Sequence, residues 1–188
     1  MMKQIIKILF LVFACLAGFQ DISAQQVAVK TNGLMWLGTV PNLGCEIVTG
    51  ERTSLDLSAF VGYKPYGKDI KIVGCQPEFR YWFNGRPMVR EYVGISALAA
   101  SYNIKWGEKR YNGDAGGVGL TVGYSLHIMK RMNLEFYGGF GVVLFRHKQY
   151  NIYDNLDDYT ADGLGKVNAH GYKLLPTKLG VSISYIIK

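Results

Sequence analysis

Long apolar runs are scarce in this chain. After an apolar segment from Ile8 to Phe19, no stretch approaches the roughly 20 apolar residues that a membrane-spanning helix needs. Helical periodicity is also missing, because no segment repeats apolar residues at the three- and four-residue spacing of an amphipathic helix. These two absences argue against a helical membrane protein and against a helical bundle.

Cysteine is nearly absent, with three residues in 188. Cys15 lies in the first apolar segment, which leaves Cys45 and Cys75. An exported chain would meet an oxidising compartment, where a disulfide is the first expectation. We place the two residues on the second and fourth strands, about 10 Å apart and beyond the roughly 7 Å limit between bridged α-carbons. The sequence therefore predicts two free thiols.

Patterns for nucleic acids, metals and cofactors are missing as well. The net charge is +7, but the Lys and Arg residues are scattered and do not alternate with aromatic residues, so nucleic-acid binding is not predicted. His147 and His170 stand alone, without metal-ligand spacing. The glycines from Gly116 to Gly123 fall inside an expected strand and open no helix, which argues against a nucleotide loop. We expect no cofactor and no metal.

The first residues do carry a pattern. Lys3 and Lys7 precede the apolar segment, and a polar break then leads to Ile22-Ser23-Ala24. This order predicts a cleaved signal peptide over residues 1–24 and one mature domain over residues 25–188. A membrane anchor needs a longer apolar run, and a lipid anchor on Cys15 would follow the bulky Phe13, so both alternatives are weaker.

Two-residue alternation is the dominant pattern of the mature chain. In the last segment, Leu179, Val181, Ile183, Tyr185 and Ile187 alternate with smaller or polar residues. Similar segments, separated by turn residues, predict eight antiparallel strands at 27–37, 42–49, 54–63, 73–83, 91–102, 114–128, 133–147 and 175–187. The expected fold is an all-β, eight-stranded, up-and-down transmembrane β-barrel in the outer membrane.

The connections and strand ends agree with this fold. Mostly short turns alternate with longer loops at 64–72, 103–113 and 148–174, which we expect outside the cell, with both termini in the periplasm. Pro77 lacks an amide hydrogen inside a strand, which predicts a bulge there. Aromatic residues near many strand ends predict two interfacial girdles, namely Trp36, Tyr63, Tyr81, Phe83, Tyr92, Tyr102, Tyr124, Phe136 and Tyr185.

Successive residues of a strand point to opposite faces, so the alternation of odd and even positions assigns the inward face of each strand. That face combines small residues with charges, and in a narrow barrel inward charges must pair. The sequence predicts a polar network that fills the lumen and leaves no open pore. Its members are Lys30, Glu46, Asp56, Glu78, Arg80, Glu135 and Lys178.

Ser125, His127 and Glu135 are the most suggestive catalytic set, because Ser, His and a carboxylate could meet on adjacent strands. A small outer-membrane lipid deacylase uses comparable residue types in a different order along the strand. The set is expected near the periplasmic end and inside the barrel, away from outer-leaflet lipids. We therefore favour a structural contact between His127 and Glu135 and predict no catalytic residue.

Acidic residues gather in the last long loop at Asp154, Asn155, Asp157, Asp158 and Asp162. Their oxygens could bind calcium, but the spacing departs from the Asp-x-Asp-x-Asp-Gly pattern and no glutamate closes it. A solvated loop or a protein-binding loop is the favoured interpretation of 148–174.

Several short blocks resemble those of a known family. They are Val29-Lys30-Thr31-Asn32, Pro41-Asn42-Leu43-Gly44 with Glu46, Ser54-Leu55-Asp56-Leu57, Gln76-Pro77-Glu78-Phe79-Arg80-Tyr81-Trp82, Asn133-Leu134-Glu135 and Pro176-Thr177-Lys178. The chain is similar to an uncharacterised domain-of-unknown-function family of small outer-membrane β-barrels, often encoded near fimbrial genes. The resemblance implies this fold and location and transfers no catalytic residue.

These observations predict a non-enzymatic outer-membrane barrel in a structural or accessory role. Its expected partners are membrane lipids and a surface protein that contacts the three long loops, and the link to fimbriae follows from the resemblance alone. Two alternatives stay open. One is a lipid-modifying hydrolase, and the other is a soluble periplasmic barrel that binds a small ligand.

Overall fold

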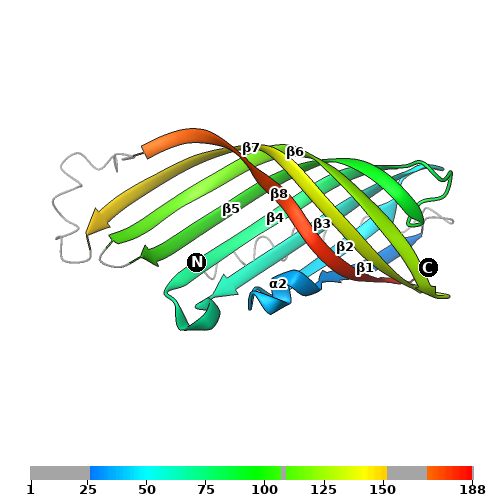
Figure 1. Cartoon of the computed structure of the whole chain (residues 1–188), viewed down its shortest axis with the longest axis horizontal. Coiled ribbons are helices and arrows are strands. Elements are labelled where there is room, and N and C mark those ends of the chain that lie inside the picture. Colours follow the sequence, from blue (N-terminus) through cyan, green and yellow to red (C-terminus); the bar gives the residue numbers. More distant parts are fainter. Residues whose placement is uncertain (1–25, 107–108, 152–168, 188) are drawn as a thin grey trace.

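The computed structural model describes residues 26–106, 109–151 and 169–187. These residues form eight strands, one short helix and a 3-10 turn (Figure 1). In chain order the elements are β1 (Val27–Asn32), α2 (Gly33–Leu37), β2 (Asn42–Val48), β3 (Thr53–Tyr63), η1 (Pro65–Gly67), β4 (Ile70–Trp82), β5 (Arg90–Trp106), β6 (Lys109–Met129), β7 (Met132–Asn151) and β8 (Ala169–Ile186).

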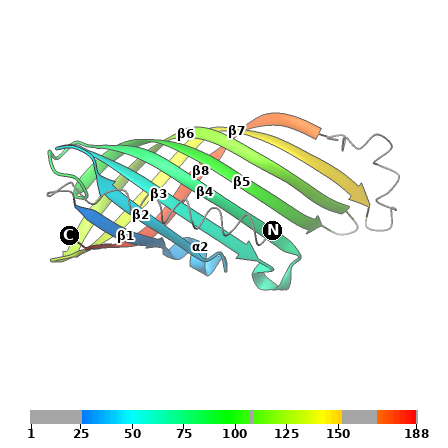
Figure 2. The ribbon, with the colours of Figure 1, turned by 180° about the vertical axis from the view of Figure 1, so that it is seen from behind.

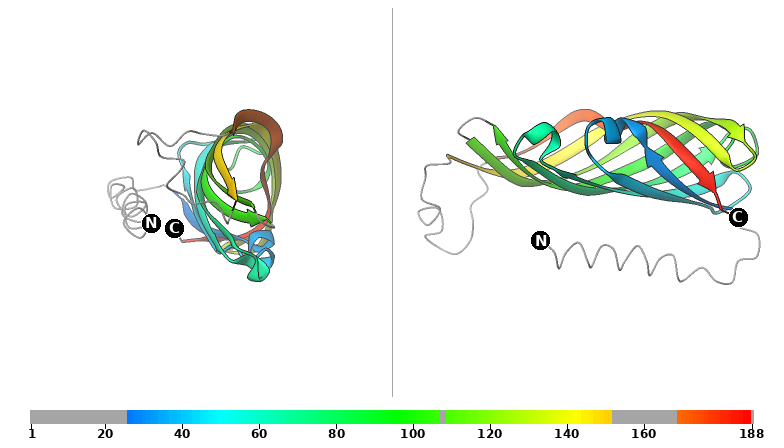
Figure 3. Two further views of the ribbon diagram at one scale, coloured as in Figure 1. Left: turned by 90° about the vertical axis from the view of Figure 1, so that its left-hand side faces the viewer. Right: turned by 90° about the horizontal axis from the view of Figure 1, so that it is seen from below.

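The strands form one closed antiparallel barrel, which confirms the predicted fold class. Each strand pairs with its neighbour in the chain, and β1 pairs with β8 to close the ring. Figure 2 shows the far side of the sheet, and Figure 3 shows the ring in a view along the barrel. No helix among the described residues has the length and apolar character needed to cross a membrane.

The two ends of the barrel differ in their connections. At the turn end lie the connections 49–52, 83–89 and 130–131, together with the start of β1 and the end of β8. At the loop end lie the connections 38–41 and 64–69, together with the ends of β5 and β7 and the starts of β6 and β8. Strands β5 to β7 reach beyond α2 at the loop end, so the wall of the barrel is taller there (Figure 1).

The faces of the strands are reversed relative to a soluble protein. On β6 Thr121 is fully buried, whereas its neighbours Leu120 and Val122 are each 64% exposed. On β3 Ser54 and Asp56 are buried inside the ring. Strand alternation thus places polar side chains inside the barrel and large apolar ones outside.

The first predicted strand, 27–37, is too long. β1 ends at Asn32, whose side chain accepts a hydrogen bond from the Leu34 amide at 3.0 Å and caps α2. Trp36 therefore lies on a helix, where its indole nitrogen donates to Thr31 Oγ1 at 2.7 Å. The local capping preference of asparagine overrides the apolar alternation there.

The predicted loops 64–72, 103–113 and 148–174 are also too long. Residues 70–72 belong to β4, 103–106 and 109–113 continue β5 and β6, and 148–151 and 169–174 continue β7 and β8. The cross-strand ladder between β5 and β6 runs without a gap to Trp106 and Lys109. Backbone pairing extends the strands through polar sequence, which hydrophobic alternation does not mark.

Pro77 is accommodated without the predicted bulge. The ladder between β4 and β5 keeps the same register on both sides of this residue, from Cys75 to Glu78, and omits only the pairs between them. The shifts in register lie elsewhere, in the β6–β7 and β7–β8 ladders. The proline removes cross-strand pairs but adds no extra residue.

The turn end is closed by a buried apolar cluster. Met88, in the connection between β4 and β5, turns into the barrel and packs with Trp82, Tyr92, Tyr137 and Ala28. Met88 has a positive φ of 63°, a conformation that a non-glycine residue rarely adopts. Hydrogen bonds from the barrel wall to the Met88 carbonyl hold this turn in place.

Candidate functional site

Seven charged side chains meet inside the barrel, and we call this group the lumen cluster. They come from six strands: Lys30 from β1, Glu46 from β2, Asp56 from β3, Glu78 and Arg80 from β4, Glu135 from β7 and Lys178 from β8. Each is at most 5% exposed. All seven residues that the sequence assigned to the lumen lie together there.

The register of the sheet forces carboxylates together. Glu46 lies opposite Asp56, and Asp56 lies opposite Glu78, so three acidic residues share one row across β2, β3 and β4. Like charges directly opposite one another are destabilising, and a buried charge without a partner is more so. Cations from elsewhere in the ring must compensate this row.

Arg80 is the centre of the compensation. Its Nη1 lies 2.8 Å from Glu46 Oε2 and 3.1 Å from Glu135 Oε2, while its Nη2 lies 2.7 Å from Asp56 Oδ2 and 2.9 Å from Glu78 Oε2. One planar guanidinium therefore contacts four carboxylates, a task that suits its fork of donors. Its Cζ also lies over the Tyr92 ring, 4.4 Å from the ring centroid.

Two lysines complete the ion pairs. Lys30 Nζ donates to Glu46 and lies 3.0 Å from Asp56 Oδ2 and 2.9 Å from Glu135 Oε2. Lys178 Nζ donates to Glu78 Oε2 at 2.6 Å. Lys30 joins β1 to β7, and Lys178 joins β8 to β4, so the cluster ties distant parts of the ring across the lumen.

The cluster extends to side chains that the sequence analysis did not assign to it. Ser54 Oγ donates to Glu46 Oε1 at 2.5 Å and accepts from Trp82 Nε1 at 2.8 Å. Alternation along β3 and β4 places Ser54 and Trp82 on the inward face, so this signal was present. Tyr92, predicted in an interfacial girdle, is instead buried inside the barrel. Met88 gives no such signal, because it lies in a turn.

Almost no space remains around the cluster. A cavity of about 20 Å³ borders Lys30, Asp56, Tyr137, Lys178 and Ser182, which is room for about one water molecule. Drug-sized ligands occupy cavities of roughly 300–1,000 Å³. At this level the interior is a packed polar core.

Ser125, His127 and Glu135 do not form a contacting set. Ser125 Oγ donates to the Met88 carbonyl at 2.9 Å, and Glu135 is engaged by Lys30 and Arg80. The predicted contact between His127 and Glu135 is wrong, because His127 Nδ1 lies 2.7 Å from Asn133 Oδ1. The ladder explains this outcome, since it sets His127 opposite Asn133 and Ser125 opposite Glu135.

The remaining candidate ligands give no metal site. Cys45 and Cys75 are free thiols, half-buried on β2 and exposed on β4. Over the described ranges, no group of three or more His, Cys, Asp or Glu side chains is placed to hold a metal ion. The acidic residues from Asp154 to Asp162, considered for calcium, lie outside the described residues, as does the expected signal peptide.

The fold and its interior define a class of protein, a closed eight-stranded barrel with a charged core and an apolar outer surface. Within that class, the chain belongs to the family of proteins of unknown function DUF3575, whose model matches residues 8–187. Membership of a family of unknown function, expected from the sequence blocks, is thereby confirmed. A search of the curated proteins and a search of the solved structures each returned no match.

Proposed function

We propose that this protein is a non-enzymatic outer-membrane barrel with a structural or accessory role at the cell surface. The observation that carries the proposal is the apolar outer surface. Large apolar side chains that are 61–65% exposed follow one another on adjacent strands, among them Ile95, Val118, Leu120, Val122, Phe140 and Leu144. Soluble monomers rarely expose contiguous apolar patches beyond a few hundred Å².

The height of this surface fits a bilayer. On β6 the outward apolar residues run from Val118 to Ile128. Ten residue steps of about 3.4 Å, inclined by about 40° to the barrel axis, span about 26 Å. The apolar band of outer-membrane barrels is about 25 Å tall.

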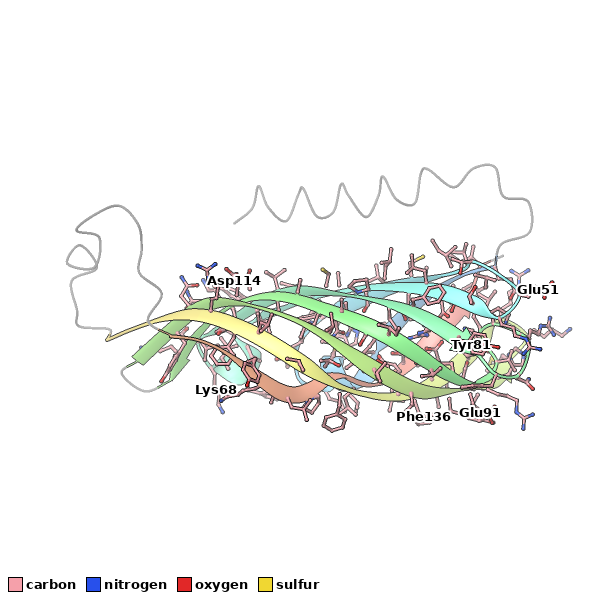
Figure 4. All side chains as sticks on the ribbon, turned by 90° about the horizontal axis from the view of Figure 1, so that it is seen from above. Glu51, Lys68, Tyr81, Glu91, Asp114 and Phe136 are labelled. Carbon is pink, nitrogen blue, oxygen red and sulfur yellow. The ribbon has the colours of Figure 1, made fainter. Side chains whose placement is uncertain are left out.

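Polar groups flank the band. In Figure 4 the labelled side chains Glu51 and Glu91 lie at the turn end, and Lys68 and Asp114 lie towards the loop end. Tyr81 and Phe136 are labelled just inside the turn end. Aromatic residues next to a charged rim are typical of a membrane interface.

The lumen cluster supports a structural role. Ion pairs that join β1, β4, β7 and β8 block the lumen at the level of the cluster, and the cavity beside them holds about one water. This arrangement disfavours both a channel and a soluble barrel that binds a small ligand. The interior stabilises the ring and leaves the loop end to meet a partner.

Membrane fractionation followed by electrophoresis in detergent tests the proposal. We expect the protein in the outer-membrane fraction and a compact unboiled form that shifts on heating, because a closed barrel resists detergent until it is boiled. A protein that stays in the soluble fraction without detergent and shows no shift would refute the membrane location.

The hydrolase alternative has a separate test. Lipid deacylation that is present in the wild type and lost on Ser125→Ala, in a variant that keeps its heat shift, would refute a non-enzymatic role. We expect no difference in lipid composition between membranes with the wild type and those with the variant. The Ser125 hydroxyl donates to the Met88 carbonyl inside the barrel, which supports that expectation.

The accessory role needs a partner at the loop end. The link to fimbriae or other surface structures is suggested by the family resemblance. A photo-crosslinking residue at Lys68, next to η1, should capture a surface protein on intact cells, whereas the same residue at Lys130 in the turn between β6 and β7 should not. Identical products from both positions would contradict a loop-end partner.

A further inference from the structure

The outer surface changes from apolar to basic near the loop end. On β4 the outward residue Val73 is followed by the exposed Lys71, and on β3 the outward Val61 is followed by Tyr63. Lys71 is the cross-strand partner of both Tyr63 and Asn103. These three side chains therefore stand in one row across β3, β4 and β5, directly beyond the apolar band.

A hollow of about 230 Å³ opens at this row, lined by Tyr63, Lys64, Asp69, Lys71 and Asn103. We call it the rim hollow. It is more than ten times the size of the cavity beside the lumen cluster and lies on the outside of the wall. Its volume suits a small polar headgroup.

The charges around the rim hollow are mainly positive. Lys64 Nζ lies 3.4 Å from Asp69 Oδ1, so the acidic residue is already engaged. Lys71 Nζ lies 5.1 Å from the centroid of the Tyr63 ring. Lys105 is the next outward residue after Asn103, and its backbone amide donates to the Asp69 carbonyl at 2.8 Å. Three lysines thus face one aspartate.

Lys71 and Lys105 differ from the lumen cations, because over the described ranges neither ammonium group forms an ion pair with a carboxylate. Both residues are exposed. Their charge is therefore available to an anion from outside the chain.

We propose that the rim hollow binds the phosphate of a phosphorylated lipid headgroup in the outer leaflet, a proposal that rests on the membrane location proposed above. Ammonium groups bind phosphate as point charges, and basic residues beside a membrane surface attract anionic headgroups. The amide of Asn103 supplies further donors. The outward faces of Val61 and Val73 lie next to the hollow, where acyl chains can cover them.

The test begins with the wild type reconstituted in phosphatidylcholine vesicles, where the heat shift reports insertion. If the protein does not insert, the membrane proposal fails. If it inserts, the detergent-purified protein is titrated with diphosphoryl lipid A or with the same lipid after removal of its phosphates, and native mass spectrometry gives the bound fraction. We expect tighter binding of the phosphorylated lipid.

The variant K71Q/K105Q removes the two available charges, and K130Q/R131Q removes the same number at the turn end. We expect the first to weaken binding of diphosphoryl lipid A by about 25-fold, at about fivefold for each lysine. The control variant should bind like the wild type. Equal losses of affinity in the two variants, or equal binding of both lipids, would refute phosphate binding by the rim hollow. Neither result would affect the proposed membrane location.

A soluble competitor separates the lipid from a free phosphate compound. Glucose 1-phosphate carries the phosphate and one sugar ring without acyl chains. We expect it to compete only at concentrations far above those of the lipid, because it cannot contact the apolar band. If glucose 1-phosphate competes at a concentration equal to that of the lipid, the ligand is a free phosphate compound and the lipid proposal is refuted.

Discussion

At the scale of single residues, the protein depends on paired charges in a place where an unpaired charge is very costly. The row formed by Glu46, Asp56 and Glu78 is compensated by Arg80 of β4 and by lysines that reach it from β1 and β8. Arg80 contacts all four carboxylates of the lumen cluster, including Glu135. Each carboxylate also contacts Lys30 or Lys178, so without Arg80 the four buried carboxylates would share only two ammonium groups.

Arg80→Ala should lower the free energy of unfolding by about 3–5 kcal/mol, because it removes the one cation that contacts all four buried carboxylates. The midpoint of urea unfolding in vesicles measures this loss. Arg52→Ala is the control, since Arg52 is exposed and only approaches the Tyr81 hydroxyl at 3.4 Å, and it should change stability by no more than about 0.5 kcal/mol. A wild-type midpoint for the Arg80 variant would contradict the role of the cluster.

Parity in the sequence was enough to place the charged residues inside, because a strand offers only two faces. It could not give their partners. The contact of Ser125 with Met88, and of His127 with Asn133, depends on the register and on a turn that folds inward. Neither the register nor the path of that turn is encoded in alternation.

At the scale of elements, glycines allow β6 and β7 to approach each other closely. A Cβ added to Gly141 would lie 2.1 Å from the Val118 carbonyl oxygen, well inside any real contact. On β6, a Cβ added to Gly116 would lie 3.8 Å from the Leu98 carbonyl oxygen, which is an ordinary contact. A methyl side chain should therefore fit at position 116 but not at position 141.

Gly141→Ala should destabilise the barrel by about 2–3 kcal/mol, because the new methyl group meets backbone that cannot move aside. Gly116→Ala should leave the unfolding midpoint close to that of the wild type. The fraction of heat-shifting protein gives a second reading if the Gly141 variant fails to assemble. Equal behaviour of the two variants would show that the close approach is not required.

The element boundaries were predictable where turn residues coincide with a change of pattern. β2 and β3 begin and end within one residue of the predicted 42–49 and 54–63. β1 and the loop-end parts of β4 to β8 were not predicted correctly. Their limits depend on the cap at Asn32 and on cross-strand pairing of polar residues, which are invisible to a hydrophobic pattern.

At the scale of the whole molecule, the apolar band decides where the barrel can reside. Leu120 is 64% exposed on the outer face of β6, within the band. Asn112 lies on the same face of the same strand, beyond Asp114 and outside the band. A charge added at these two positions should have different effects.

Leu120→Lys should cost about 2–4 kcal/mol in the membrane, the range for a lysine near the middle of a bilayer. The yield of heat-shifting protein in the membrane fraction should fall accordingly. Asn112→Lys should assemble like the wild type. A soluble barrel would tolerate both changes equally, and that result would refute the membrane location.

Residues 152–168, which connect β7 to β8 in the sequence, should be dispensable for folding. Replacing residues 152–168 by a flexible Gly-Ser linker of about six residues should preserve the heat shift, because the ladder from Ala169 to Tyr185 on β8 is untouched. A deletion of 144–174 also removes paired residues and should lower the unfolding midpoint. Loss of assembly in the shorter deletion would contradict a loop without a folding role.

β1 is the shortest strand of the barrel, and its pairing is limited to Val27–Lys30 with β2 and Ala28–Asn32 with β8. Few backbone hydrogen bonds therefore fasten it, and Lys30 supplies a second attachment through Glu135. A single ammonium group therefore ties β1 to β7. Disassembly should start by peeling β1 away, so its amides should exchange with deuterium before those of β6, and the charged core would be wetted at the first step of unfolding.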